Sequence, residues 1–194
     1  MIQPSGAHSG PVAQCPAHVL GNGAAILSGR PRGAQLREEA ARRLRQEPEP
    51  CLLPLDFSGV EFMDVSCADE LLEGLLSEVL RGGFGERRLV AQGMNASVRD
   101  TADAVLRLRE RALLAREAAG AAVLGHLRAP LRQALNAVLE HRRITSPRLA
   151  EALGRNLNIA CNRLNALQRQ GLVWRWRDGA SSGGGRQYCY ESLV

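Results

Sequence analysis

Two neighbouring segments in the last third of the chain place apolar side chains at helical spacing. Residues 146–153 put Leu149 and Leu153 on one face. The next segment repeats apolar side chains at i, i+3, i+4, i+7 and i+10: Leu157, Ala160, Cys161, Leu164 and Leu167. This spacing predicts two short amphipathic helices. Gly154 lies between them and Gly171 follows the second, so each predicted helix ends at a glycine.

The polar positions of the second segment carry amide and guanidinium groups rather than carboxylates. The second helix is expected to begin near Asn156. Beyond it, residues 172–177 and 187–191, LVWRWR and QYCYE, predict two strands on either side of a glycine-rich tip. Two helices joined by a tight turn and followed by a β-hairpin are the layout of a helix-turn-helix with a wing.

This segment resembles the winged helix-turn-helix of bacterial transcription regulators, and the resemblance covers residues 129–194. Its ending matches their pattern L-x-x-L-x-x-x-G-L-V, here Leu164, Leu167, Gly171, Leu172 and Val173. The resemblance implies binding to double-stranded DNA, in which amides pair with adenine and arginines contact guanine or phosphate. The alternative for each residue is an ordinary solvated surface. The residues expected at the DNA are Asn156, Asn158, Asn162, Arg163, Arg175, Arg177 and Arg186.

The first 128 residues alternate predicted strands with predicted helices. The pattern predicts a strand pair at 18–28, a helix at 30–46, a strand at 51–57, a helix at 66–80, a strand at 87–92 and a helix from 95 to about 127. The strand at 51–57 is nearly all apolar, as expected for a strand covered on both faces. Pro54 within it cannot donate a hydrogen bond, which indicates an edge position or a bulge. The alternation predicts an α/β class with a mixed sheet and helices.

The segment 56–72, DFSGVEFMDVSCADELL, resembles the STAS-like family of unknown function, and the resemblance spans residues 18–115. The family shows an aspartate-bearing strand, a G-V turn, a serine-rich helix start and an A-D-E-L continuation, here Asp56-Phe57, Gly59-Val60, Ser66-Cys67 and Ala68-Asp69-Glu70-Leu71. Relatives of this fold, the anti-sigma-factor antagonists, bind a kinase-like partner and are switched by phosphorylation of a serine at this helix start. The resemblance therefore implies a kinase-like protein partner, with Ser66 as a regulatory phosphosite or partner contact.

Ser66 has a second interpretation as the N-cap of the predicted helix. A phosphate at a helix N-terminus is electrostatically favourable, but Asp64, Asp69 and Glu70 would crowd it. Both interpretations stay open at this point.

The formal net charge of +5 is unevenly distributed along the chain. Residues 129–194 hold ten arginines and four carboxylates, a balance of +6, whereas residues 1–128 hold fifteen arginines and sixteen carboxylates, a balance of −1. The excess positive charge therefore lies on the segment that resembles a DNA-binding unit, where phosphate contacts require it.

The cysteines indicate neither a metal centre nor a disulfide framework, because the five are widely spaced and no C-x-x-C pair occurs. We therefore expect reducing, cytoplasmic surroundings. The sequence contains no apolar run of membrane-spanning length and no signal-peptide pattern. No nucleophile–base pair, phosphate-binding loop or metal cluster is recognisable in it, so we expect no enzymatic activity, no cofactor and no metal site.

These patterns divide the chain into a disordered tail (1–17), an STAS-like domain (18–115), a helical linker (116–128) and a winged helix-turn-helix domain (129–194). We expect a DNA-binding transcriptional regulator whose STAS-like domain receives a signal or binds a partner. The alternative is a protein-interaction module resembling an anti-sigma-factor antagonist and switched by a kinase-like partner. A homodimer is expected, because such units read two DNA half-sites and the stretch 101–127 offers a helix for pairing between subunits.

Overall fold

The computed structural model describes residues 12–178 and 187–194. Within them, a mixed sheet has the strand order β1-β4-β6-β7-β8, and β2 also pairs with β4. Its strands are β1 (Ala13–Gln14), β2 (His18–Val19), β4 (Cys51–Asp56), β6 (Arg87–Gln92), β7 (Ala112–Glu117) and β8 (Gly120–Gly125). Neighbouring strands in this sheet are parallel except β7 and β8, which form an antiparallel hairpin.

Helices cover one face of this sheet. They are α1 (Arg30–Gln46), α4 (Ala96–Leu108) and a third helix that begins as α2 (Val65–Ala68), widens into a π-helical turn (Asp69–Glu73) and continues as α3 (Gly74–Leu80). A 3-10 turn (Leu20–Gly23) and a small parallel pair, β3 (Ile26–Leu27) with β5 (Phe62–Met63), complete this α/β part. The predicted α/β class with a mixed sheet is confirmed, and the expected bounds of α1 and β6 agree with the structure.

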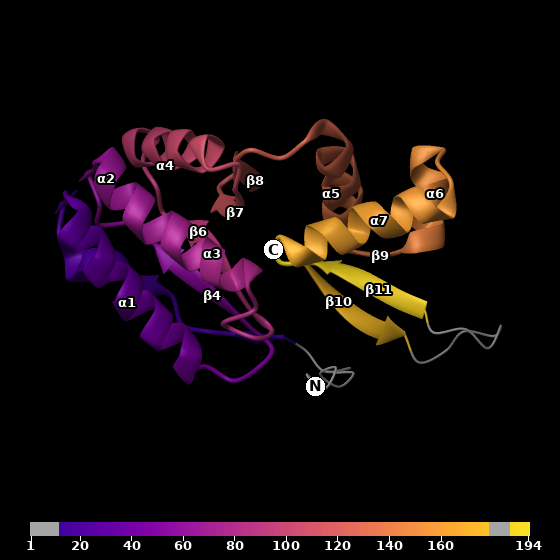
Figure 1. Cartoon of the computed structure of the whole chain (residues 1–194), viewed down its shortest axis with the longest axis horizontal. Coiled ribbons are helices and arrows are strands. Elements are labelled where there is room, and N and C mark those ends of the chain that lie inside the picture. Colours follow the sequence, from indigo (N-terminus) through magenta and orange to yellow (C-terminus); the bar gives the residue numbers. More distant parts are fainter. Residues whose placement is uncertain (1–11, 179–186) are drawn as a thin grey trace.

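The remainder of the described chain forms a helical unit with its own small sheet. Its elements are α5 (Ala129–His141), β9 (Arg143–Thr145), α6 (Ser146–Leu153), α7 (Leu157–Arg169), β10 (Val173–Asp178) and β11 (Gln187–Ser192). The strands are antiparallel in the order β10-β11-β9, so the strand between α5 and α6 joins the hairpin that follows α7. We call residues 129–194 the C-terminal unit. Figure 1 shows this unit on one side of the view and α1, α3 and α4 on the other.

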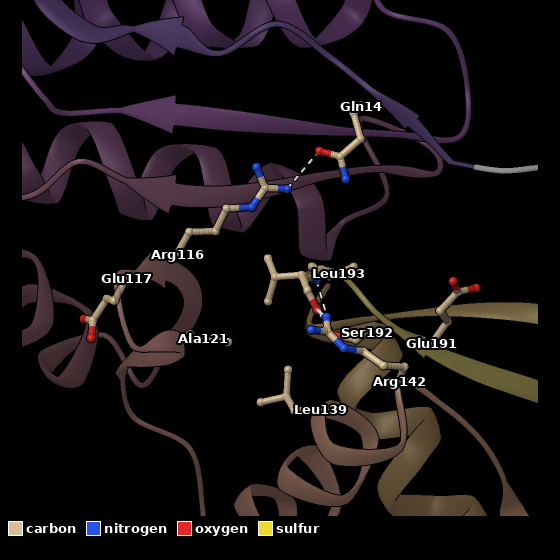
Figure 2. A pocket seen from close by; sticks show the side chains of 11 residues that line it. Gln14, Arg116, Glu117, Ala121, Leu139, Arg142, Glu191, Ser192 and Leu193 are labelled. Carbon is tan, nitrogen blue, oxygen red and sulfur yellow. Dashed lines mark hydrogen bonds between the residues drawn. The ribbon is translucent and has the colours of Figure 1, made fainter.

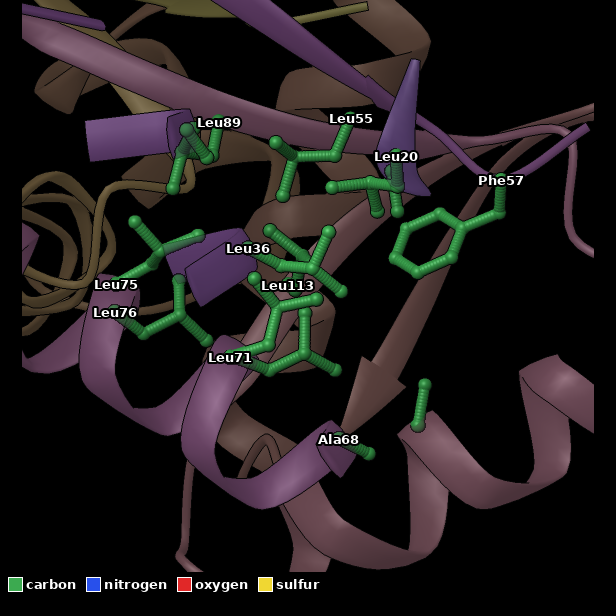
Figure 3. Close-up of a cluster of buried hydrophobic side chains, with 14 of the residues drawn as sticks. Leu20, Leu36, Leu55, Phe57, Ala68, Leu71, Leu75, Leu76, Leu89 and Leu113 are labelled. Atoms are coloured by element: carbon green, nitrogen blue, oxygen red, sulfur yellow. The ribbon is translucent and has the colours of Figure 1, made fainter. Parts of the chain in front are cut away.

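The central strands of the mixed sheet send alternate side chains into two different cores. In β4, Leu53 and Leu55 lie in a core with α1 and the α2–α3 helix, whereas Leu52 lies in a second core with the C-terminal unit. In β6, Leu89 and Val90 divide in the same way. Figure 3 shows the first core, where side chains of α1 and α3 meet those of β4, β6 and β7. Both faces of the sheet are therefore buried, as the apolar sequence of β4 predicted.

Pro54 lies inside β4 without breaking a ladder hydrogen bond. Along the side of β6, Pro54 lies opposite Val90 and pairing is continuous. On the other side, β1 pairs up to Leu52 and β2 resumes pairing at Leu55. The carbonyl groups of Pro50 and Leu52 face β1, and backbone groups alternate along a strand, so the nitrogen of Pro54 faces the break between β1 and β2. The edge position expected from the sequence is wrong, because β4 has neighbours on both sides, and the proline is accommodated at this break instead.

The helix expected from residue 95 to about 127 is wrong beyond Leu108. α4 ends there and the β7–β8 hairpin follows, so residues 116–128 are not a helical linker. Alanine and leucine favour a helix, but residues 112–115 are all buried between the two cores, which an amphipathic helix does not permit. A Cβ at Gly125 would lie 2.2 Å from the carbonyl oxygen of Arg111, so the hairpin end requires glycine. The sheet thus extends beyond the boundary expected at residue 115.

The expected N-terminal boundary also differs from the structure. Residues 1–11 lie outside the described residues, but Ala13–Gln14 pairs with β4 and Cys15 is buried. The segment 12–17 therefore belongs to the sheet rather than to a disordered tail. The strand pair expected at 18–28 is wrong as well, because β2 pairs with β4 and β3 with β5.

Arg88 and Gly171 lie where the sheet meets the C-terminal unit. Arg88, on β6, is 8% exposed, and its guanidinium carbon lies 5.6 Å from the ring centroid of Trp174 on β10. Its Nη1 donates to two main-chain carbonyl groups of its own part. Gly171 has a φ of 71°, and a Cβ there would lie 3.0 Å from Cγ1 of Val79 on α3. The two parts are packed directly against each other at this junction.

Gly171→Ala tests the junction, with Gly154→Ala as a matched control. Both glycines have a positive φ, so alanine adds a similar left-handed strain of about 1–2 kcal/mol at each position. Only at Gly171 does the new Cβ meet the α/β part, since none of the described residues comes within 4 Å of it at Gly154. We expect Gly171→Ala to lower the free energy of unfolding by about 1–3 kcal/mol more than the control, measured by urea denaturation. Equal losses would show that the junction is not packed at this point.

Candidate nucleic-acid interface

The turn at residues 154–156 joins α6 to α7. Gly154 has the left-handed conformation that its sequence position predicted, with a φ of 58°. The main-chain N–H of Arg155 donates to the carbonyl oxygen of Ala150 at 2.9 Å and closes the end of α6. Asn156 is the N-cap of α7, because its Oδ1 accepts a hydrogen bond from the main-chain N–H of Ile159 at 2.9 Å. Asn156 thus fixes the direction in which α7 begins.

α7 presents a polar face on the side away from its core. Ala160, Leu164 and Leu167 are buried, whereas Asn158 and Asn162 are exposed. A separation of four residues places these two amides one above the other on the same side of the helix. The structure therefore brings together two of the residues expected at DNA.

The first turn of α7 also exposes two apolar side chains, Leu157 at 50% and Ile159 at 37%. The expectation that Leu157 belongs to the buried face is therefore wrong, and sequence reasoning did not single out Ile159. Arg163 lies on a different side of α7 from the amides of Asn158 and Asn162. It is half-buried, and its Nη1 donates to Oε1 of Gln133 on α5 at 3.5 Å. Arg163 therefore occupies the side of α7 that faces α5.

The β10–β11 hairpin alternates exposed arginines with buried tryptophans. Arg175 and Arg177 are exposed, whereas Trp174 and Trp176 are 4% and 6% exposed. The two indole rings stack with their centroids 5.8 Å apart, and Nε1 of Trp176 donates to Oε2 of Glu191 at 2.8 Å. Core packing of the tryptophans is confirmed. The tip of the hairpin, with the candidate Arg186, lies outside the described residues.

The tyrosines of β11 lie on the opposite face of the hairpin from the tryptophans. The register places Tyr190 opposite Arg175 and Tyr188 opposite Arg177. The Tyr190 hydroxyl donates to Oδ1 of Asn165 on α7 at 2.8 Å, and the guanidinium carbon of Arg175 lies 4.7 Å from the ring centroid of Tyr188. One face of the hairpin is thus tied to α7, and the other meets the mixed sheet.

Ten ion pairs lie in the α/β part of the described chain. They join arginines to carboxylates between residues 30 and 117, as Arg99 does with Glu117 at 2.7 Å. In the described part of the C-terminal unit, several exposed arginines have no carboxylate within ion-pair distance: Arg148, Arg155, Arg169 and Arg177. Their positive charge is therefore available to an external anion.

Asp64, and not Ser66, caps the start of α2. Its carboxylate accepts hydrogen bonds from the hydroxyl of Ser28 at 2.6 Å and the main-chain N–H of Gly29 at 2.8 Å. It also accepts from the main-chain N–H of Cys67 at 2.7 Å and from the hydroxyl of Ser66 at 2.8 Å. These donors, Ser28 first and Cys67 next, hold the pKa of Asp64 well below its usual range. The cap expected at Ser66 is wrong, because the stronger acceptor two residues earlier takes that place.

Comparison of the chain with protein-family models, with curated proteins and with solved structures finds no match. Among the helices of the described residues, none has both the length and the apolar character that crossing a membrane requires. Residues 12–178 and 187–194 contain no group of three or more His, Cys, Asp or Glu side chains placed to hold a metal ion. The geometry of the described side chains is thus the ground on which a function has to be argued.

We expect Asp64→Asn to lower the free energy of unfolding by about 1–3 kcal/mol near neutral pH, because asparagine can still cap but gives up the charge-assisted hydrogen bonds. The Asp64 pKa is lower in the folded chain than its unfolded value of about 3.9, so its stabilisation is complete above that value and declines as the pH falls through the folded-state pKa. Urea denaturation over a series of acid pH values should therefore show a weaker pH dependence in the variant. A loss in Ser66→Ala that equals or exceeds the loss in Asp64→Asn would contradict the assignment of the cap.

Proposed function

We propose that the C-terminal unit is a winged helix-turn-helix that binds double-stranded DNA, and that the protein is a DNA-binding transcriptional regulator. The observation that carries this proposal is the pair of exposed amides, Asn158 and Asn162, on the second helix after a tight turn. They lie in a unit where, among the described residues, Arg148, Arg155, Arg169 and Arg177 are exposed and have no carboxylate within ion-pair distance. In this proposal α7 is the recognition helix.

The order and packing of the elements support this proposal. α5 and α6 both pack against α7, so α7 is held from behind while its amide face is left open. β9 joins the hairpin to the segment between α5 and α6, which fixes the hairpin beside the helices. A recognition helix held by a preceding helix and flanked by a hairpin can contact the major groove and the adjoining phosphates together.

The N-terminal half of α7 supplies the base contacts in this proposal. Asn158 and Asn162 suit adenine, because a side-chain amide pairs with the N6 and N7 positions through two hydrogen bonds. Leu157 and Ile159 suit the methyl group of thymine, which also faces the major groove. This combination of amides and apolar side chains predicts a preference for A·T pairs.

The other expected residues take supporting roles. Asn156 orients α7 by capping it. Arg163, on the side of α5, and Arg175 and Arg177, on the hairpin, suit phosphate groups, which position a protein on DNA without reading its sequence. Arg186 remains a candidate phosphate contact on its sequence position alone.

Asn162→Ala tests base reading, and Asn136→Ala, an exposed amide on α5, is its matched control. The target is a duplex that the full chain selects from a random DNA pool. We expect Asn162→Ala to weaken binding to this duplex by about 1–3 kcal/mol and to relax the preference at one base pair, with the control unchanged. Fluorescence anisotropy measures both affinities. A pool that never converges, together with equal affinities for the two variants, would falsify DNA reading by α7.

Arg177→Ala tests phosphate contact by the hairpin. We expect it to weaken binding to the selected duplex and to an unrelated duplex by the same factor, because phosphates carry no sequence information. The slope of log K against log salt should become shallower by about 1, since one fewer counterion is released. A loss confined to the selected duplex would instead assign Arg177 to a base.

We also propose that the regulator binds DNA as a homodimer, since helix-turn-helix units commonly read two half-sites. The pairing helix expected at 101–127 is not continuous, because α4 ends at Leu108, so pairing has to use another surface. Sedimentation of the selected complex should give a mass of two chains per duplex. One chain per duplex at saturation would overturn the dimer.

A second candidate function is a protein-interaction module that binds a kinase-like partner through the α/β part. The observation that favours it is an apolar patch beside Ser66, formed by Ile26, Phe62 and Val65, which are 65%, 47% and 58% exposed. Ile26 and Phe62 are neighbours across the β3–β5 pair. Grouped apolar side chains at a surface are typical of interaction sites. Phe62→Ser should leave DNA affinity unchanged and abolish co-purification of an ATP-binding partner if this candidate is correct.

A further inference from the structure

A pocket of about 570 Å³ opens between the mixed sheet and the C-terminal unit. One wall is formed by Gln14 on β1, Arg116 on β7 and Ala121 on β8, and the other includes Leu139 on α5 and Leu193. Figure 2 shows the guanidinium group of Arg116 reaching toward Gln14, with Leu193 and Leu139 on the side of the C-terminal unit. Neither part of the protein forms this pocket alone.

Arg116 belongs to a polar row across the carboxyl ends of three parallel strands. The register places Asp56 beside Gln92 and Gln92 beside Arg116. Because side chains alternate along each strand, all three share the sheet face on which Val90 meets the C-terminal unit. Open α/β sheets bind their ligands at the carboxyl ends of parallel strands. Nε2 of Gln92 donates to Asp56 at 3.3 Å, so Asp56 is engaged within the row and Arg116 is the member that lines the pocket.

The charges around Arg116 leave it available to an anion. Its Nη2 donates to Oε1 of Gln14 at 3.0 Å, and no carboxylate of residues 12–178 and 187–194 lies within ion-pair distance of it. The two acids that line the pocket have other partners: Glu117 pairs with an arginine on α4, and Glu191 accepts a hydrogen bond from a tryptophan on β10. A guanidinium has five N–H donors, so Arg116 can still bind a carboxylate through two parallel hydrogen bonds.

The opposite wall combines the apolar Leu139 and Leu193 with the polar Arg142, Glu191 and Ser192, and it is fixed in place. Arg142 has a φ of 59°, a left-handed conformation that a non-glycine residue adopts only where its surroundings enforce it. Its carbonyl oxygen accepts from the main-chain N–H of Ser192 at 2.9 Å, and its Nη1 donates to the carbonyl oxygen of Val194. These contacts hold the end of β11 against α5 and keep Leu193 beside the pocket.

We propose that this pocket binds a small organic anion, with its carboxylate on Arg116 and its apolar body against Leu139 and Leu193. A ligand in this position contacts both the mixed sheet and the C-terminal unit. It therefore alters the packing of that unit on the sheet. Binding depends only on the pocket residues. Its consequence, a change in DNA affinity, rests on the proposed function.

The binding test uses the full chain and anilinonaphthalene sulfonate, a fluorescent probe with an anionic group on an apolar ring system, displaced by octanoate. We expect one saturable site per chain and a loss of affinity of about tenfold or more in Arg116→Ala, because a hydrogen-bonded charge pair is removed. Arg42→Ala, an exposed arginine on α1, is the matched control and should bind as the unchanged protein does. Circular dichroism confirms that each variant is folded, and Arg116→Gln replaces Arg116→Ala if the latter is not. Equal affinity in the Arg116 variant, or no saturable binding, overturns the site.

The regulatory step is tested with octanoate and the selected duplex. We expect saturating octanoate to change the DNA affinity of the unchanged protein several-fold and to leave that of Arg116→Ala unaltered. An unaltered affinity in both proteins overturns the regulatory step. Absence of DNA binding without octanoate overturns the proposed function instead, and the probe titration then decides the pocket by itself.

Discussion

Burial of both faces of the mixed sheet is the constraint on which the rest of the structure depends. β4 and β6 carry apolar side chains on both faces of the sheet, so each face needs an apolar cover to exclude water. α1, α4 and the α2–α3 helix cover one face, and the C-terminal unit covers the other through a core that includes Leu52, Val90 and Leu114 of the sheet. The two parts therefore share a core, which explains why no linker helix separates them.

The α/β part and the C-terminal unit differ in how their arginines are paired with carboxylates. In the α/β part, many arginines pair with carboxylates, as Arg109 does with Asp69 and Arg111 with Glu73. In the described part of the C-terminal unit, the exposed Arg148, Arg155, Arg169 and Arg177 lack such partners, although the unit is packed on the sheet by apolar contacts. Apolar packing holds the unit in place, and its charge is left for an external partner.

Local signals in the sequence predicted most elements, and tertiary contacts decided the rest. The caps around Gly154 and Asn156 and the bounds of α1 follow from periodicity and from residues with fixed conformational roles. The β7–β8 hairpin could not be predicted in this way, because its alanines and leucines favour a helix until the sheet offers them a ladder. The pocket was equally hidden from sequence reasoning, since Gln14, Arg116 and Leu193 come from distant segments that meet only in the folded chain.

The packing of Arg88 on Trp174 has a spectroscopic consequence. The chain contains two tryptophans, and both belong to β10 at the junction of the two parts. Indole emission of this protein therefore arises from the junction, where a guanidinium and a second indole contact the emitting ring. A rearrangement that separates the C-terminal unit from the sheet would move these rings into water and shift their emission to longer wavelength. The protein thus carries an intrinsic optical reporter of the contact between its two parts.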